Sequence, residues 1–546
     1  ITTSHYNVLV GYDAGKSITA GAGRSVLIGT FAGDAQTTSD YNVAIGYHAM
    51  GANQVGSDNI VIGGAAGYDL QGPENVIIGS SAGANLTTTS GSVVIGHQAL
   101  ISGTTDKWQV VIGQKAMYYH PAGAATEGTV AIGYKAMYQS KGSNTSGTVA
   151  IGNAAANAIT HGSHGVFIGY AAGHNVQVGS YNTCVGRQSG YSVRSGSENA
   201  FFGYGAGFYT TGSYNTFVGS RAGWGGTTSA PYSSGEYNTA VGYYALKGFT
   251  TGYSNTAIGR HAMQSATTAH ENVTLGANAG YDMTTAADNV VIGFESAKNY
   301  ETNERNITIG HKAHYTATNG DDNVIIGHQA GYYCDQSDWN VFIGGYAGYK
   351  LGDTGGATGH NNGDSSYNIA IGYEAMGGGD DTVANNVAAA NVAIGHHALG
   401  GSTRESDGTA LSGDQNTVVG TFAMESATSA ANNVVIGHDA GKSVTTTTEA
   451  VIIGMNAGDA ITTTNYAVLV GAYAGSAINS TDANGTIAIG LEAARDLTSG
   501  QGNTAIGHQA FKVGTEIDYN TVIGYQAGMD LSGSSGTQAE GNTFVG

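Results

Sequence analysis

The sequence predicts an all-β fold, a β-solenoid of about 30 coils with a 17-residue repeat. Three observations predict it: a glycine-centred phrase occurs 30 times, 18 of the 29 intervals between its glycines are 17 residues long, and each copy carries a short alternating apolar run. A unit of this length is too short for a helical hairpin or a propeller blade, which take roughly 34 to 45 residues. It fits one coil of a β-solenoid.

The phrase appears as "YNVAIGYHAM" at 41–50 and as "YNIAIGYEAM" at 367–376, and its polar columns predict an internal ladder. Asn stands four residues before the glycine in 21 copies, where a short amide can bond local backbone and its equivalent in the next coil. The glycine suits a bend with positive φ, and the Ala three residues later marks a corner without room for a larger side chain. The representative ladder residues are Asn42, Gly46, Ala49, Asn289, Gly293, Asn433 and Gly437.

The apolar residues of the phrase occupy both faces of a strand. Val43 and Ile45, three and one residues before the glycine, share one face, and we expect them to fill the interior of the coil. The residue between them is apolar as well, and a strand that is apolar on both faces is normally buried on both sides. We therefore expect this second column to form an interface between chains. Around Gly454 it comprises Val418, Val435, Ile452 and Leu469.

The remaining leg of each coil is rich in Ser, Thr and Gly. We expect one inward apolar residue per coil on this leg, such as Val176, Met283 or Ile461, and a solvent-facing position at Thr464. Short Thr tracts, at 445–448 for example, leave an ice-binding solenoid as an alternative, although neighbouring coils do not sustain them.

Composition excludes several classes of partner. The net charge is −20 with only 19 Lys and Arg, so we expect no nucleic-acid binding, which depends on neutralising phosphates. No run of about 18 apolar residues predicts a membrane span, and two cysteines do not make a disulfide framework. The sequence contains no metal-binding motif of the usual spacing, and we expect no metal and no cofactor.

Tyr or His often follows the glycine of the phrase. We expect these residues to form a row of half-exposed rings that stack along the rod. Contact with sugars, or a metal held by His311 and His328, remains as an alternative for such a row.

The whole chain, 1–546, is predicted to be one continuous solenoid whose coils lengthen in five places. Loops raised from a rigid scaffold are where binding residues concentrate. We therefore consider glycan or receptor contact at the insertions, with ordinary tolerated insertion, calcium binding and glycan hydrolysis by a carboxylate pair as alternatives. The insertions lie near 220–238, 345–367, 373–390, 396–415 and 525–541, and the candidate contact residues are Tyr349, Asp353, His360 and Asp364.

The motif N-[VT]-x-[IV]-G-x-x-A, as in "NVAIGYHA" at 42–49 and "NTAIGRHA" at 255–262, is similar to the head repeats of YadA-like trimeric autotransporter adhesins and to related repeats of phage tail fibres. The resemblance implies a left-handed β-roll, three chains wound about one axis, an extracellular location and attachment to host surfaces. The spacing of 17 residues exceeds that of the adhesin heads by a few residues, so a phage fibre and a bacterial adhesin both remain open.

Together these patterns predict an extracellular structural and adhesive fibre on a cell or virion surface. Its expected partners are further copies of the chain, as a homotrimer, and a glycan or receptor on a host or cell surface. We expect no enzymatic activity. The alternatives are a polysaccharide-degrading enzyme of the tailspike type and the ice-binding solenoid.

Overall fold

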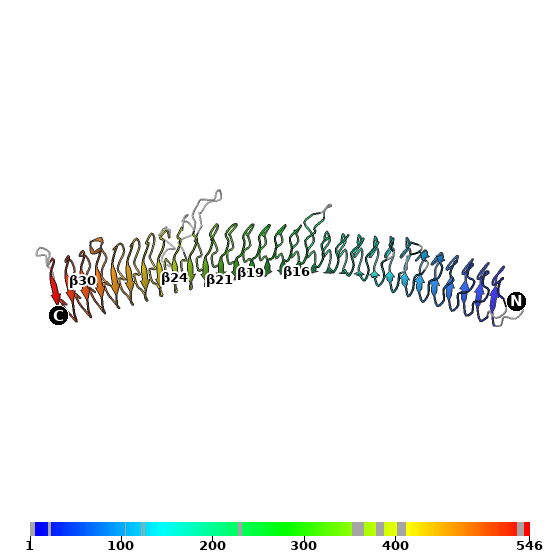
Figure 1. The fold of residues 1–546 in the computed structure, drawn as a ribbon, viewed down its shortest axis with the longest axis horizontal. Helices are drawn as coiled ribbons and strands as arrows, with labels where there is room; N and C mark the ends of the chain where they lie inside the picture. Colours follow the sequence, from blue (N-terminus) through cyan, green and yellow to red (C-terminus); the bar gives the residue numbers. More distant parts are fainter. Residues whose placement is uncertain are drawn as a thin grey trace. The chain divides into compact units, whose positions relative to one another are not determined.

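The computed structural model describes residues 6–19, 23–103, 105–121, 123, 126–142, 144–227, 232–351, 365–377, 387–400, 411–531 and 540–546. The chain falls into two compact units, residues 1–270 and 271–546. Each unit is a stack of coils, and each coil contributes one three-residue strand to a parallel sheet (Figure 1). The predicted β-solenoid with a spacing near 17 residues is confirmed.

Fifteen strands form the sheet in the described part of each unit, and consecutive strands pair in parallel, except that β7 pairs with β5 and with β9. In the first unit they are β1 (Val8–Val10), β2 (Val26–Ile28), β3 (Val43–Ile45), β4 (Ile60–Ile62), β5 (Val76–Ile78), β7 (Val93–Ile95), β9 (Val110–Ile112), β10 (Val130–Ile132), β11 (Val149–Ile151), β12 (Val166–Ile168), β13 (Thr183–Val185), β14 (Ala200–Phe202), β15 (Thr216–Val218), β16 (Thr239–Val241) and β17 (Thr256–Ile258). Two further strands, β6 (Asn85–Leu86) and β8 (Ser102–Gly103), pair on the other leg.

The second unit repeats this arrangement and adds one 3-10 turn, η2 (Thr481–Ala483). Its strands are β18 (Val273–Leu275), β19 (Val290–Ile292), β20 (Ile307–Ile309), β21 (Val324–Ile326), β22 (Val341–Ile343), β23 (Ile369–Ile371), β24 (Val392–Ile394), β25 (Thr417–Val419), β26 (Val434–Ile436), β27 (Val451–Ile453), β28 (Val468–Val470), β29 (Ile487–Ile489), β30 (Thr504–Ile506), β31 (Thr521–Ile523) and β32 (Thr543–Val545).

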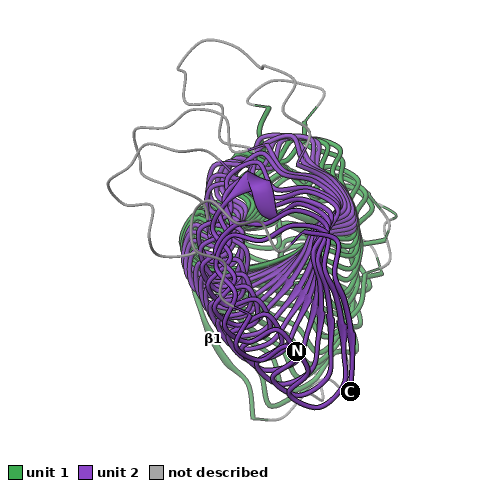
Figure 2. Ribbon diagram, turned by 90° about the vertical axis from the view of Figure 1, so that its left-hand side faces the viewer, with its two compact units in different colours: residues 1–270 green, residues 271–546 purple. Residues whose placement is uncertain are grey.

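Equivalent residues of neighbouring coils lie directly beside one another. In the pair β26 and β27, for example, Val435 stands opposite Ile452. Hydrogen bonds between coils continue past the strand, because the Gly46 N–H donates to the Ile28 carbonyl at 2.8 Å and the Met50 N–H to the Ala66 carbonyl at 3.1 Å. Seen along the stack (Figure 2), the coils of each unit overlie one another, so residues at the same place in successive coils form rows.

The asparagine column forms the predicted ladder. The Asn289 Oδ1 accepts hydrogen bonds from the backbone N–H of Asn306 at 2.9 Å and from its Nδ2 at 3.2 Å, while the Asn289 Nδ2 donates to the Asn303 carbonyl at 2.7 Å on the opposite leg. Asn42 accepts in the same way from the next coil, and Asn433 donates to the preceding one. Because these buried amides satisfy backbone groups of two legs, they fix both the register of the stack and the shape of the coil.

The glycine of the phrase is required for two reasons. Gly46 has a φ of 136°, which L side chains rarely adopt, and a Cβ at this position would lie 2.6 Å from the Gly63 carbonyl oxygen of the next coil. Gly293 and Gly437 share the conformation, with φ of 133° and 144°. Ala49, three residues after Gly46, is fully buried, as predicted.

The interior of the coil is lined by the middle residue of each strand, not by its two neighbours. Ala44 is fully buried, whereas Val43 and Ile45 lie on the outer side of the sheet and are partly exposed. The prediction that Val43 and Ile45 fill the interior is therefore wrong. The inward apolar residues expected on the other leg are confirmed, since Val176 and Ile461 are fully buried.

Two columns of the interior exchange volume with one another. Wherever Phe is the middle residue of a strand and the coil continues, the fourth residue after the phrase glycine is Gly. Where the middle residue is Ala, that position holds Met, Leu, Phe or Ala and never Gly. The pairs with Phe are Phe167 with Gly173, Phe201 with Gly207, Phe217 with Gly223 and Phe342 with Gly348.

Candidate functional site

The outer side of the sheet is an aliphatic surface, which we call the outer face: the first and third residues of every three-residue strand in the described sheet. These positions hold Val, Ile and Thr with single Leu, Phe and Ala residues, and among the described strands none of them is charged. Val273 is 44% exposed, Leu275 45% and Ile436 38%. A parallel sheet with one uncovered face of this composition is unusual, because parallel sheets are normally buried on both sides.

The extent of the outer face exceeds that of an ordinary surface patch. At about 40–60 Å² for each partly exposed side chain, the outer face of one unit presents on the order of 1,200–1,800 Å², whereas the largest apolar patch of a typical monomer covers about 300–600 Å². That area is comparable with the total surface buried in a stable protein–protein interface, roughly 1,200–2,000 Å².

The residues predicted to form the interface between chains lie elsewhere. Each is the middle residue of its strand and is fully buried inside its own coil, so none can contact a second chain, and the assignment is wrong. The prediction assigned the two faces of the strand the wrong way round. The alternation of residues along a strand separates two apolar faces, but it does not indicate which of them points inward. The residues concerned are Val418, Val435, Ile452 and Leu469.

A second polar ladder, not predicted from the sequence, runs two residues before the asparagine column. In the first unit the Ser163 and Ser180 N–H groups donate to the hydroxyls of Ser180 and Ser197 in the following coils at 3.2 and 3.1 Å. In the second unit the column turns acidic, and the Glu304 and Asp321 N–H groups donate to the carboxylates of Asp321 and Asp338. The signal was a column of short oxygen-bearing side chains at a fixed distance from the Asn.

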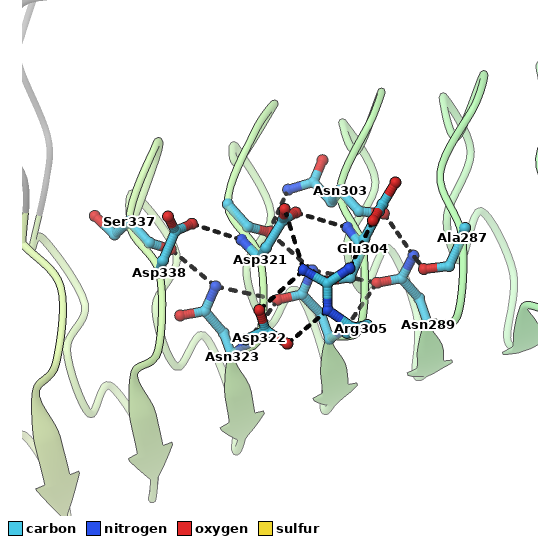
Figure 3. A network of polar contacts seen from close by, with 12 residues as sticks. Ala287, Asn289, Asn303, Glu304, Arg305, Asp321, Asp322, Asn323, Ser337 and Asp338 are labelled. Atoms are coloured by element: carbon cyan, nitrogen blue, oxygen red, sulfur yellow. Dashed lines mark hydrogen bonds and ion pairs between the residues drawn. The ribbon is translucent and has the colours of Figure 1, made fainter.

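This acidic stretch lines a shallow groove on the second unit. Figure 3 shows its side chains and the polar contacts between them. Burial and the neighbouring Asp338 carboxylate raise the pKa of Asp321, with burial the larger cause. The carboxylates already have partners: backbone N–H groups hold Asp321 and Asp338, and Arg305 binds Asp322 at 2.8 Å and Glu304 at 2.6 Å. The row therefore serves to join coils.

One buried cluster has the composition of a hydrolase triad. The His120 Nε2 lies 3.1 Å from the Asp106 Oδ1, and its Nδ1 lies 3.2 Å from the Ser140 hydroxyl. Thr126 also donates to Asp106, through its backbone N–H at 3.0 Å and its hydroxyl at 2.8 Å. All four residues lie inside the coil with at most 1% of their surface exposed, so a substrate would not reach the hydroxyl. The cluster places hydrogen-bonded polar groups in the interior, although the second carboxylate oxygen of Asp106, Oδ2, has no hydrogen-bond partner there.

The candidate contact residues of the insertions lie mostly outside the described part of the chain: of the four, only Tyr349 is described. Its ring packs on Tyr332 at a centroid distance of 5.5 Å and edge-on against Tyr333 and Tyr346. Tyr349 thus belongs to a row of rings along the stack. Asp353, His360 and Asp364 lie outside the described residues.

Rings at the corner after the glycine stack on one another from coil to coil. The His311 and His328 rings are nearly parallel at 5.1 Å, and Phe294 continues the row at 5.4 Å from His311. In the described residues, no three His, Cys, Asp or Glu side chains gather as ligands of a metal would. Stacking covers the faces of these rings, which leaves their edges for an outside ligand.

The polar leg also differs from the prediction. Thr464 is fully buried and its hydroxyl donates to the Ser480 carbonyl at 2.8 Å, so its expected solvent exposure is wrong. The Thr428 and Thr445 hydroxyls likewise donate to carbonyls of the next coil, each at 2.9 Å. The hydroxyls of these threonines are hydrogen-bonded between neighbouring coils, so they do not form a row of free hydroxyls on the surface.

Neither a scan against protein-family models nor a comparison with curated proteins finds a match for this chain. The described residues contain no helix with the length and apolar character needed to cross a membrane.

Proposed function

We propose that the protein is a self-assembling, extracellular structural and adhesive fibre in which three copies pack through their outer faces. The observation that supports this most strongly is the uncovered, uncharged aliphatic surface of the parallel sheet. A covering partner must offer apolar residues at the same repeat over many coils, and a second copy of the chain has that periodicity. The resemblance of the repeat to trimeric adhesin heads and phage fibres supports three copies and a location on a cell or virion surface.

The fibre acts as a rigid spacer that presents contact surfaces to a host or cell-surface glycan or receptor. Rigidity within each unit follows from the hydrogen-bond ladders, since the described parts of the coils are bonded to their neighbours on both legs. In this role the chain performs no catalytic step and uses no cofactor.

Solution mass tests the assembly directly. Sedimentation equilibrium of the full chain, 55.2 kDa, should give the mass of three copies at micromolar concentration. The double variant Ile436→Lys, Ile453→Lys should dissociate at higher concentration and melt at lower temperature, because it introduces unpaired charges into a closed interface. Ser429→Lys, Thr446→Lys, on exposed positions of the opposite leg in neighbouring coils, is the matched control and should behave like the parent. A monomeric parent would refute the proposal.

A further inference from the structure

Charge is distributed very unevenly along the chain. Between Lys107 and Arg260 the sequence contains nine Lys and Arg but three Asp and Glu, whereas the rest of the chain contains ten and thirty-six. No acidic residue occurs between Glu127 and Glu198. A positive segment in a protein with a net charge of −20 is not explained by the repeat, whose ladders and interior need no cations.

Five of these cations lie at one corner of the first unit, and we call them the basic strip. Each follows the phrase glycine by one, two or five residues, so in stacked coils they line the same edge of the first unit. Arg187 is exposed and the others are half-buried. The basic strip comprises Lys115, Lys135, Arg187, Arg221 and Lys247.

Aromatic rings hold the cations of the basic strip in place. The guanidinium groups of Arg187 and Arg221 lie 5.7 and 5.4 Å from the Tyr204 ring, which stands between them. The Lys135 ammonium group lies 5.1 Å from the centre of the Tyr138 ring. The Lys247 ammonium group lies 4.7 Å from the centre of the Tyr244 ring. Such contacts position a cation without neutralising its charge.

Carboxylates, in contrast, do not neutralise the strip. Among the described residues, none of its five side chains forms an ion pair, and the nearby acids Glu198 and Glu236 stand before the strand, at the opposite end from the strip. Cations of the second unit behave differently: Lys442 binds Asp439 at 3.1 Å and Arg495 binds Asp496 at 2.8 Å. The positive charge of the strip is therefore available to an outside anion.

We propose that the basic strip binds an acidic polysaccharide lying along the stacked coils of the first unit. Arg187 and Arg221 are two coils apart, about 9–10 Å at the usual spacing of neighbouring strands. Carboxylate or sulfate groups recurring along an extended sugar chain meet donors at such intervals, and a guanidinium binds either group in a bidentate manner. The inference deepens the adhesive part of the proposed function and rests on it.

The structure favours a polysaccharide over a single-stranded nucleic acid. The bases of a single-stranded nucleic acid bind to proteins by stacking on open aromatic faces. Several rings beside the strip are already engaged: Tyr204 lies between two guanidinium groups, and the Tyr191 and Phe208 rings stack at 4.8 Å. The strip offers guanidinium N–H groups, ammonium groups and tyrosine hydroxyls, which suit anionic groups and sugar hydroxyls.

The test measures binding of the full chain to immobilised polygalacturonate and dextran sulfate, with neutral dextran as the blank. The parent should bind at least one acidic polymer, and binding should weaken as salt rises, because the screening length at physiological ionic strength is about 8 Å. The triple variant Arg187→Gln, Arg221→Gln, Lys247→Gln should bind at least about tenfold more weakly, since three charged donors are removed. The variant Lys442→Gln, Arg495→Gln, Lys512→Gln changes net charge equally and should bind like the parent.

The two acidic polymers distinguish a carboxylate ligand from a sulfate ligand. The inference would be overturned if both triple variants lost binding equally, or if the parent bound neither polymer. Tighter binding of the parent to single-stranded DNA or to anionic lipid vesicles would overturn it as well. Sedimentation of the same samples separates the two proposals: an intact assembly that binds neither polymer contradicts only the basic strip, whereas a monomeric parent contradicts the fibre. Arg187→Lys, Arg221→Lys should retain most of the binding, which a merely structural role for the guanidinium stacking does not predict.

Discussion

The ring of Phe201 occupies the space that a side chain at position 207 would need: a Cβ on Gly207 would lie 2.5 Å from Phe201 Cε2. The two residues are an instance of the exchange of volume that keeps successive coils the same size. Since packed interiors tolerate little change in volume, coils of different size would not stack.

This exchange predicts a rescue between two substitutions. Ala44→Phe should destabilise the protein by about 1–3 kcal/mol through overpacking. Met50→Gly, which recreates the pairing of Phe201 with Gly207, should recover much of that loss, giving a coupling of at least about 1 kcal/mol in the double-mutant cycle. Denaturant melts of the parent, both single variants and the double variant measure it. Strictly additive effects would contradict constant coil volume.

Replacing either of two neighbouring glycines by Ala should affect stability very differently. Gly63→Ala places a Cβ 2.5 Å from the Gly79 carbonyl oxygen in a backbone with φ of 139°, so we expect a loss of about 3 kcal/mol or more. Gly64→Ala meets nothing within 4 Å and should change stability by less than about 0.5 kcal/mol. Thermal melts of the two variants are the check, and equal losses would argue against close glycine contacts between coils.

The buried His314 should make stability depend on pH. Its Nδ1 lies 2.5 Å from the Tyr300 hydroxyl and its Nε2 2.7 Å from the Cys334 carbonyl, an arrangement that fits a neutral ring with a proton on Nε2. Burial lowers the pKa of His314 to about 4 from its ordinary 6.5. As pH falls, His314 is protonated in the unfolded chain before it is protonated in the folded protein. The contribution of the neutral, buried His314 ring to the free energy of unfolding is therefore complete above pH 6.5 and is lost between pH 6.5 and 4.

The expected loss over that window is on the order of 3 kcal/mol. In His314→Leu the contribution is absent, and the difference in unfolding free energy between parent and variant should shrink as pH falls from 7 to 4. A difference that stays constant across this range would show that His314 does not titrate on unfolding.

The repeat predicted the solenoid, its spacing, the asparagine ladder and the glycine bend, because those depend on local backbone geometry repeated many times. The orientation of the strand was inverted because alternation alone is symmetric between faces. The signal that resolves it is the variability of the middle column: Ala44 and Phe201 differ greatly in size, and only an inward column can be compensated by residues such as Met50 and Gly207.

Other features arise from residues of different coils that come together only when the coils stack, and the sequence repeat does not predict them. The Ser180 ladder was visible only as a weak column of short polar residues. The basic strip combines positions one, two and five residues after the glycine, and its separation from carboxylates depends on how the coils stack. The candidate loop residues Asp353 and His360 lie outside the described residues, and their role stays a prediction.

Two valines of nearly equal exposure allow a direct test of the outer face. Val434, on the outer face, is 37% exposed in the single chain, and Val513, on the other leg, is 36% exposed. The native cysteines, Cys184 and Cys334, are fully buried, and burial raises the pKa of both thiols, so they give little background in thiol labelling.

The decisive measurement is the labelling rate of Val434→Cys and Val513→Cys in the native protein, each normalised to its rate in denaturant. If the outer face joins the chains, the thiol at 434 is covered and should react at least about tenfold more slowly than the thiol at 513, because labelling must wait for the interface to open. Equal native rates at the two positions would contradict the account, since the aliphatic face would then lie open to solvent.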